Sequence, residues 1–275
     1  MSTDDRPTAR RTGPVTTLLA ALVVTAGLLA SGAPTARAQA PTPVALADSL
    51  ESGVTAAFMA GDTARLREMA TLAERAAAAH PDDPWLPYYR GFALYRLGTL
   101  ALSQDEDRAD RILERAQQVF RRSAERDSLA ESFALLASTK GMRISVNPMV
   151  RGMTMGSEVG GHLETAMELA PENPRVWLVR GVNALNTPGM FGGGTDEAIR
   201  RLQKALSLFS GPSASGPAPS WGEAETYAWL GQAYADQDSV AMARTAYRDA
   251  LRLEPDFRWV SEQLLPALRD GGDQG

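Results

Sequence analysis

The sequence contains no cysteine, which excludes disulfide bonds, thiolate catalysis and cysteine-ligated metal sites. Histidine is almost as scarce, and the two residues present, His80 and His162, leave little for nucleophile activation or metal ligation. His80 precedes a proline at the end of a predicted helix, where a cation stabilises the helix C-terminus. We therefore predict a non-enzyme with no catalytic residues, no metal site and no cofactor. A pair of carboxylates is the remaining enzymatic alternative, although the acidic run at 105–110 is typical of a solvated helix start.

Lysine is also rare: Lys140 and Lys204 are the two lysines, and the remaining basic residues are arginines. Beyond residue 38 the chain has 24 basic and 31 acidic residues. Nucleic-acid binding needs clustered Lys and Arg for phosphate contacts. We therefore expect no nucleic-acid partner.

Long apolar runs are absent except near the N-terminus, where residues 15–30 are uncharged and apolar. This run is shorter than the roughly 20 residues that a membrane-spanning helix needs. Arginines precede it and small residues follow it, as in a secretory signal peptide. We predict a cleavable signal peptide at 1–38 and an exported protein, periplasmic or secreted, with no membrane span after cleavage. Cleavage after Ala40, an uncleaved anchor, and twin-arginine export through Arg10–Arg11 are the alternatives.

Self-similarity at a period of about 34 residues dominates the rest of the chain. It is clearest in "ETYAWLGQAYADQDSVAMARTAYRDALRLEPD", residues 225–256, which matches the spacing W-x2-L-G-x2-Y-x8-A-x3-F-x2-A-x4-P. The matching residues are Tyr227, Leu230, Gly231, Tyr234, Ala243, Tyr247, Ala250 and Pro255. This unit resembles the tetratricopeptide repeat (TPR) family. Glycine and alanine stand where two helices would cross closely, and the proline follows a helix that it could not continue.

Weaker units keep the same phase along the chain. Gly91 and Gly181 take the glycine position in two of them, although Gly98 is an alternative anchor for the first. The resemblance implies an all-α, right-handed solenoid of antiparallel helix pairs, about five pairs plus a C-terminal capping helix. Residues 128–269 also resemble exported bacterial TPR proteins of unassigned role, through "NPMVRGMTMGS", "PENPRVWLVRGVNALNTPGMFGGG" and "WGEAETYAWLGQAYA".

The expected domain organisation follows from this register. After the signal peptide, the segments are a degenerate N-terminal helix pair at 39–81, central repeats at 82–209, a Pro/Gly/Ser-rich flexible linker at 210–221, the last repeat and capping helix at 222–269, and a tail at 270–275.

Two central repeats carry inserts between their helices, at 142–156 and 187–197. The second contains Gly192, Gly193 and Gly194, but it lacks the lysine and the preceding strand of a phosphate-binding loop. We interpret it as a turn in which glycine permits positive φ, followed by a helix capped by Thr195 or Asp196. Because both inserts lie on one edge of the solenoid, they could pack together or form a binding edge. The candidate edge residues are Arg143, Arg151, Met153, Met190 and Phe191.

The first helices of TPR pairs line a concave groove, where tyrosine and arginine are good anchors for a peptide. The candidate binding residues there are Tyr88, Phe92, Tyr95, Arg96, Arg175, Asn186 and Gln232. The same aromatic stripe could instead be core between repeats. The favoured function is a scaffold that binds a protein or peptide partner of the cell envelope, with self-association as a further property. An accessory protein of a solute transporter that binds a small molecule is the alternative.

Overall fold

The structure, a computed structural model, describes residues 41–211 and 219–270. The predicted signal peptide, most of the predicted linker and residues 271–275 of the tail lie outside the described residues. The described residues form helices and no strand. The α-helices are α1 (Pro43–Met59), α2 (Thr63–Ala79), α3 (Trp85–Ala101), α4 (Glu106–Asp127), α5 (Ala130–Val146), α6 (Pro148–Leu169), α7 (Pro174–Leu185), α8 (Thr195–Phe209), α9 (Glu223–Ala235), α10 (Val240–Leu253) and α11 (Leu265–Asp270). A short 3₁₀ turn, η1 (Gly189–Phe191), precedes α8, and a π-helical turn, η2 (Trp259–Leu264), leads into α11.

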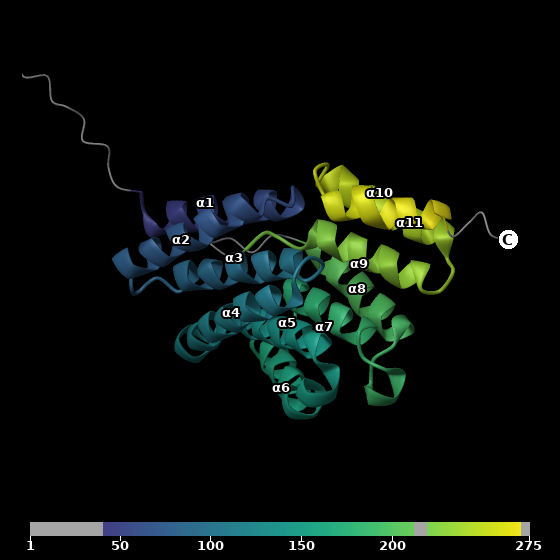
Figure 1. Ribbon diagram of the computed structural model, residues 1–275, viewed down its shortest axis with the longest axis horizontal. Helices are drawn as coiled ribbons and strands as arrows, with labels where there is room; N and C mark the ends of the chain where they lie inside the picture. Colours follow the sequence, from purple (N-terminus) through teal and green to yellow (C-terminus); the bar gives the residue numbers. More distant parts are fainter. Residues whose placement is uncertain (1–40, 212–218, 271–275) are drawn as a thin grey trace, which may run out of the picture. The chain divides into compact units, whose positions relative to one another are not determined.

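The helices pack as consecutive pairs, α1 with α2 through α9 with α10, and η2 with α11 covers the last pair (Figure 1). The first helix of each pair also contacts the first helix of the next pair. The predicted solenoid of five helix pairs with a C-terminal cap is therefore confirmed.

The first and second helices of a pair differ in burial. In α3, eleven of seventeen residues are buried, whereas α4 buries six of twenty-two along one face. A helix that is buried on most sides lies inside the packing, and one with a single apolar stripe lies outside. The first helices thus form the inner layer and the second helices the outer layer.

Small residues set the distance between the two helices of a pair. A Cβ atom added to Gly91 would lie 2.7 Å from the Phe120 ring, and one added to Gly181 would lie 2.7 Å from Leu202. The helices approach as closely as the repeat spacing predicted. Gly98, the alternative anchor, approaches the same helix equally closely, since a Cβ added there would lie 2.6 Å from Leu113.

The predicted insert at 142–156 is not a loop. Helix α5 continues to Val146 and α6 starts at Pro148, so the residues between them reduce to Asn147. The Asn147 side chain accepts a hydrogen bond from the backbone N–H of Val150, and Pro148 occupies the first helical turn. Asparagine as N-cap followed by proline is a favourable helix start, and it outweighs the glycines that follow.

The second insert is a tight turn. Gly192 (φ 82°) and Gly194 (φ 102°) have left-handed backbone conformations, as the glycine run predicted. Gly193 is required for a different reason: a Cβ atom added there would collide with the carbonyl oxygens of Thr187 and Ala184. Gly194 is the N-cap of α8 and no side chain caps this helix, so the prediction that Thr195 or Asp196 does so is wrong. The turn closes instead through the backbone, with Gly194 N–H donating to the Ala184 carbonyl at 2.8 Å.

We expect Gly193→Ala to lower the melting temperature, because the new methyl group pushes against backbone rather than against a movable side chain. The cost should be about 1–3 kcal/mol of unfolding free energy, measured by urea denaturation. Gly189→Ala in the same turn is the matched control, since an added Cβ there meets nothing within 4 Å. Equal effects of the two substitutions would contradict this explanation of the turn.

The first and last units of the solenoid touch each other. The rings of Phe58 in α1 and Phe257 before η2 lie 6.3 Å apart, and the Arg258 guanidinium donates to the carbonyl of Ala60 at 3.3 Å. The end of α1 lies beside the C-terminal helices in Figure 1. This contact joins the two ends of the row of helix pairs.

Among the described helices, none combines the length and the apolar character needed to cross a membrane.

Candidate functional site

The predicted groove residues on α3 lie in an aromatic cluster around a tryptophan from outside the repeats. Tyr88 and Phe92 are fully buried. The Trp221 ring stacks on Phe92 with centroids 5.0 Å apart, and its indole N–H donates to the Tyr88 hydroxyl at 2.9 Å. Burial raises the pKa of Tyr88, so this hydroxyl stays protonated. Trp221 thus occupies the inner face that the sequence assigned to a partner.

The backbone at Ser220 and Trp221 is held by hydrogen bonds to Glu51. The Glu51 carboxylate on α1 accepts hydrogen bonds from the backbone N–H groups of Ser220 and Trp221, the latter at 3.1 Å. It also accepts from the Ser220 hydroxyl at 2.8 Å and, through its other oxygen, from the Tyr89 hydroxyl at 3.2 Å. Charge-assisted bonds of this kind are stronger than neutral ones. We call residues 219–222 the inner segment.

A buried ion pair lies next to the inner segment. Arg96 on α3 pairs with Glu225 on α9, and both side chains are over 90% buried. The Arg96 guanidinium lies 4.2 Å from the ring centroid of Phe58 and 4.7 Å from that of Phe92, within the range of cation–π attraction. Burial lowers the pKa of Arg96 to about 10, which leaves it charged at neutral pH. Glu225 is therefore the counter-ion of a charge that water does not reach.

The other predicted groove residues divide into two groups. Arg175 and Tyr95 join the interior: Arg175 donates to the Trp221 carbonyl at 3.5 Å, and the Tyr95 hydroxyl lies 3.0 Å from the hydroxyl of Ser138. Asn186 and Gln232 do not join it. Asn186 is exposed and bonds the Val182 carbonyl at 2.8 Å, and Gln232 bonds its helical neighbour Asp236 at 2.9 Å. The inner face is thus filled by the chain's own side chains rather than open.

Of the predicted edge residues, the two arginines form ion pairs within the protein. Arg143 and Arg151 both bind Asp110 on α4, with Arg143 Nε at 3.0 Å and Arg151 Nη1 at 2.6 Å from the same oxygen. Burial alone would raise the pKa of Asp110, but hydrogen bonds from these arginines lower it. The two arginines therefore join α4, α5 and α6, and they are not free to anchor a partner.

The apolar residues of the predicted edge are exposed to solvent. The five most exposed large apolar side chains among the described residues all belong to the start of α6 and to η1, and they are between 60% and 88% exposed. They are Met149, Val150, Met153, Met190 and Phe191, and we call them the exposed edge. Because these side chains are so exposed, they do not form the packed plug that the sequence left open as an alternative. Figure 1 shows the turns between α5 and α6 and between α7 and α8 on the same side of the helix pairs.

His162 on α6 is a half-buried residue to which the sequence assigned no role. Its Nε2 atom is buried and has no hydrogen-bond partner among the described residues, and its ring lies 6.2 Å from that of Phe133. Burial, helped by nearby Lys140, lowers the pKa of His162, with Glu158 opposing the shift. The fold therefore favours the neutral imidazole.

This histidine should make the protein acid-sensitive. The unfolded chain takes up the His162 proton below about pH 6.5, and the folded chain does so only at lower pH. Stability is thus lost as the pH falls from about 6.5 through the folded pKa. We expect His162→Gln to narrow the gap in melting temperature between pH 7.5 and pH 5.0. A gap as wide as that of the parent protein would contradict this assignment.

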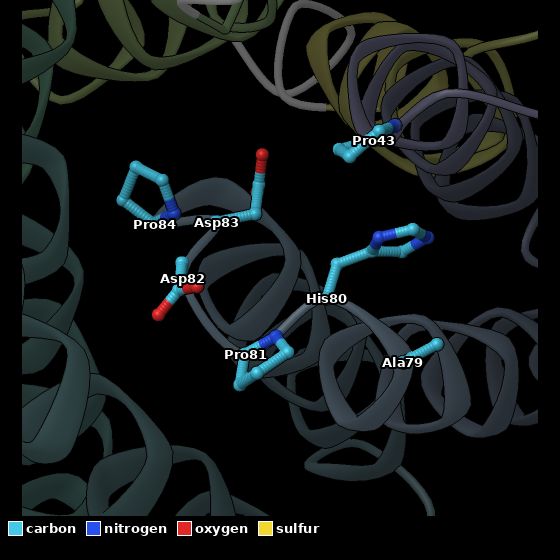
Figure 2. Close-up of a pocket in the computed structure, with 7 residues that line it drawn as sticks. All are labelled: Pro43, Ala79, His80, Pro81, Asp82, Asp83 and Pro84. Atoms are coloured by element: carbon cyan, nitrogen blue, oxygen red, sulfur yellow. The ribbon is translucent and has the colours of Figure 1, made fainter.

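A surface pocket of about 410 Å³ lies at the turn between α2 and α3 (Figure 2). Figure 2 shows the His80 imidazole directed toward Pro43 and the carboxylate of Asp82 directed away from it. The Asp83 carboxylate accepts from the backbone N–H groups of Trp85 and Leu86, both at 2.9 Å. The polar side chains of this pocket thus either point in different directions or hydrogen-bond the backbone of the turn, so they do not converge on a common point. His80 is the C-cap residue of α2, at the helix end where the sequence placed it.

Trp221 and Glu51 were not predicted from the sequence as residues of this site. Trp221 was assigned to a flexible linker because proline, glycine and serine surround it. A large aromatic residue in such a stretch is itself an indication of docking, because an exposed tryptophan costs free energy that burial recovers. Nothing in the sequence around Glu51 indicated that it binds the inner segment, because carboxylates are frequent on the solvent-facing sides of helices.

Comparison with known proteins gives structural neighbours alone: no family model matches the chain, and neither does any curated protein. The HusA haemophore from Porphyromonas gingivalis is similar at 26% identity and a TM-score of 0.58, over 71% of this chain and 96% of that one. The thermophilic TPR protein TTC0263 of Thermus thermophilus is similar at 20% identity and a TM-score of 0.55, over 82% of this chain and 97% of that one. The chain therefore has a TPR-like helical-repeat fold, as its repeat spacing predicted.

Proposed function

We propose that the protein is a non-catalytic interaction module of the bacterial cell envelope that binds a protein partner through the exposed edge. The observation that carries the proposal is that the five most exposed large apolar side chains of the described residues belong to two turns on the same side of the helix pairs (Figure 1). Exposed apolar patches on soluble domains commonly mark interaction sites, and flexible methionines adapt to a partner's shape. The envelope location rests on the signal-peptide pattern at 1–38.

The proposal places the contact on the edge and not on the concave helix face that the sequence favoured. Tyr88, Phe92 and Arg96 are buried, so a partner cannot touch them without displacing the chain's own residues. Met153 and Phe191 need no such rearrangement. An apolar segment of a partner laid across them would remove their side chains from water.

The test is affinity capture from cells of the source organism. We expect the chain to retain a partner that the double variant Met153→Ser and Phe191→Ser loses. The matched control replaces two exposed apolar residues elsewhere, Val44→Ser and Leu253→Ser, and should retain the partner. Loss of capture in both variants, or in neither, would contradict binding through the edge.

A second candidate is capture of a haem-like ligand at the same edge. The similarity to the HusA haemophore favours it, since that chain is matched over 96% of its length. A methionine-rich apolar surface suits a flat apolar macrocycle, and methionine sulfur is an accepted ligand of haem iron.

Haemin titration separates the two candidates. Haem capture requires a saturable shift of the Soret absorbance near one equivalent of haemin, and a loss of that shift in the Met153→Ser and Phe191→Ser variant. An absorbance change that does not saturate, or that survives in the variant, would exclude haem capture at the edge.

A further inference from the structure

The inner segment is held in the manner of a bound peptide. It is not helical, its backbone N–H groups at Ser220 and Trp221 bond one carboxylate, and its aromatic side chain enters an aromatic site. The carboxylate and the aromatic site belong to helices far away in sequence, α1 and α3. Backbone capture together with one deep side-chain anchor is how extended peptides are recognised.

The surrounding contacts define what this site accepts. Phe92 offers a flat aromatic face, and the Arg96 guanidinium lies 5.1 Å from the Trp221 ring centroid. The Tyr88 hydroxyl accepts a hydrogen bond from the indole N–H, a donor that a phenylalanine side chain lacks. Gly222 (φ 118°) turns the chain away immediately after the tryptophan, and a Cβ there would press on Phe209. The site thus fits a Ser-Trp-Gly sequence.

We propose that the inner face is a recognition site for an extended segment that carries a tryptophan. Residues 219–222 occupy it in cis, and a partner segment of the same chemistry binds by displacing them. A tethered segment competes at an effective concentration in the millimolar range, so the site is closed to weak external ligands. This site is distinct from the exposed edge and does not depend on the function proposed there.

The test uses a fluorescein-labelled peptide with the sequence of residues 219–224, PSWGEA, and fluorescence polarisation. We expect the Trp221→Ala variant, with helical circular dichroism like that of the parent, to bind this peptide at least tenfold more tightly than the parent does. Adding Glu51→Ala to that variant should weaken binding at least fivefold, because the carboxylate that receives the peptide backbone is gone. Adding Phe191→Ser instead should change nothing, which separates this site from the edge. A peptide with alanine in place of tryptophan should not bind.

A folded Trp221→Ala variant that binds the peptide no better than the parent would overturn the proposal. Should that variant not fold, the parent protein answers the same question by hydrogen exchange. The peptide at millimolar concentration should speed exchange of the backbone amides of Ser220 and Trp221 at least twofold, and the alanine peptide should not. Unchanged exchange would overturn the proposal equally.

Discussion

Glu225→Ala is expected to lower the free energy of unfolding by about 3–5 kcal/mol, the usual cost of removing one partner of a buried ion pair. The reason is Arg96, whose guanidinium stays charged and buried after its counter-ion is removed. The surrounding rings of Phe58 and Phe92 attract the cation but cannot accept its hydrogen bonds. Urea denaturation monitored by circular dichroism measures the loss.

Two control variants isolate this effect. Glu223→Ala removes a second acidic residue from the first turn of α9, so it reports the loss of helix-dipole stabilisation alone, about 0.3–1 kcal/mol. The double variant Arg96→Met and Glu225→Leu removes both charges, and it should be far more stable than Glu225→Ala, because apolar replacement of a buried pair is often neutral or stabilising. A Glu225→Ala variant within about 1 kcal/mol of the parent would show that Arg96 is not buried as described.

Phe92→Ala is expected to cost about 3–5 kcal/mol, the range for truncating a fully buried aromatic side chain. Phe92 stacks on Trp221 and on Tyr88, so its loss leaves a cavity at the point where the inner segment meets α3. Thermal and urea denaturation should show the change, and Trp221 fluorescence should respond because its stacking partner is gone.

The same substitution at an exposed position is the control. Phe191→Ala changes a side chain that is 72% exposed, so its effect on stability should stay within about 0.5 kcal/mol. The contrast separates the two faces of the protein: Phe92 stabilises the fold, and Phe191 is exposed to solvent. Similar stabilities of the two variants would contradict the burial of α3.

The helix pairs could be predicted from the sequence because each pair is a local unit with its own spacing. Gly91 and Gly181 mark the helix crossings, and the residues that they face, Phe120 and Leu202, are near in sequence. Asn173 and Pro174 begin α7, with the asparagine as N-cap. The same pair of residue types at Asn147 and Pro148 begins α6, although it lies inside the predicted insert at 142–156.

The filling of the inner face could not be predicted in this way. It depends on contacts between Trp221 and Tyr88 and between Glu51 and Ser220, which are 133 and 169 residues apart. A repeat pattern describes how neighbouring units pack, and it carries no information on contacts that close the solenoid. The sequence therefore singled out Tyr88, Phe92 and Arg96, but it left open whether they bind a partner or form core between repeats, and their burial agrees with the second alternative.

Photocrosslinking in cells of the source organism, with p-benzoylphenylalanine incorporated at one position at a time, tests most directly which face binds a partner. In place of Phe191, on the exposed edge, we expect an adduct with a partner protein. In place of Ser220, which is exposed but bound to Glu51, we expect the main product to be a crosslink within the chain to α1. A partner adduct from position 220 in greater yield than from position 191 would contradict binding through the exposed edge, because the inner face would then be the open binding surface.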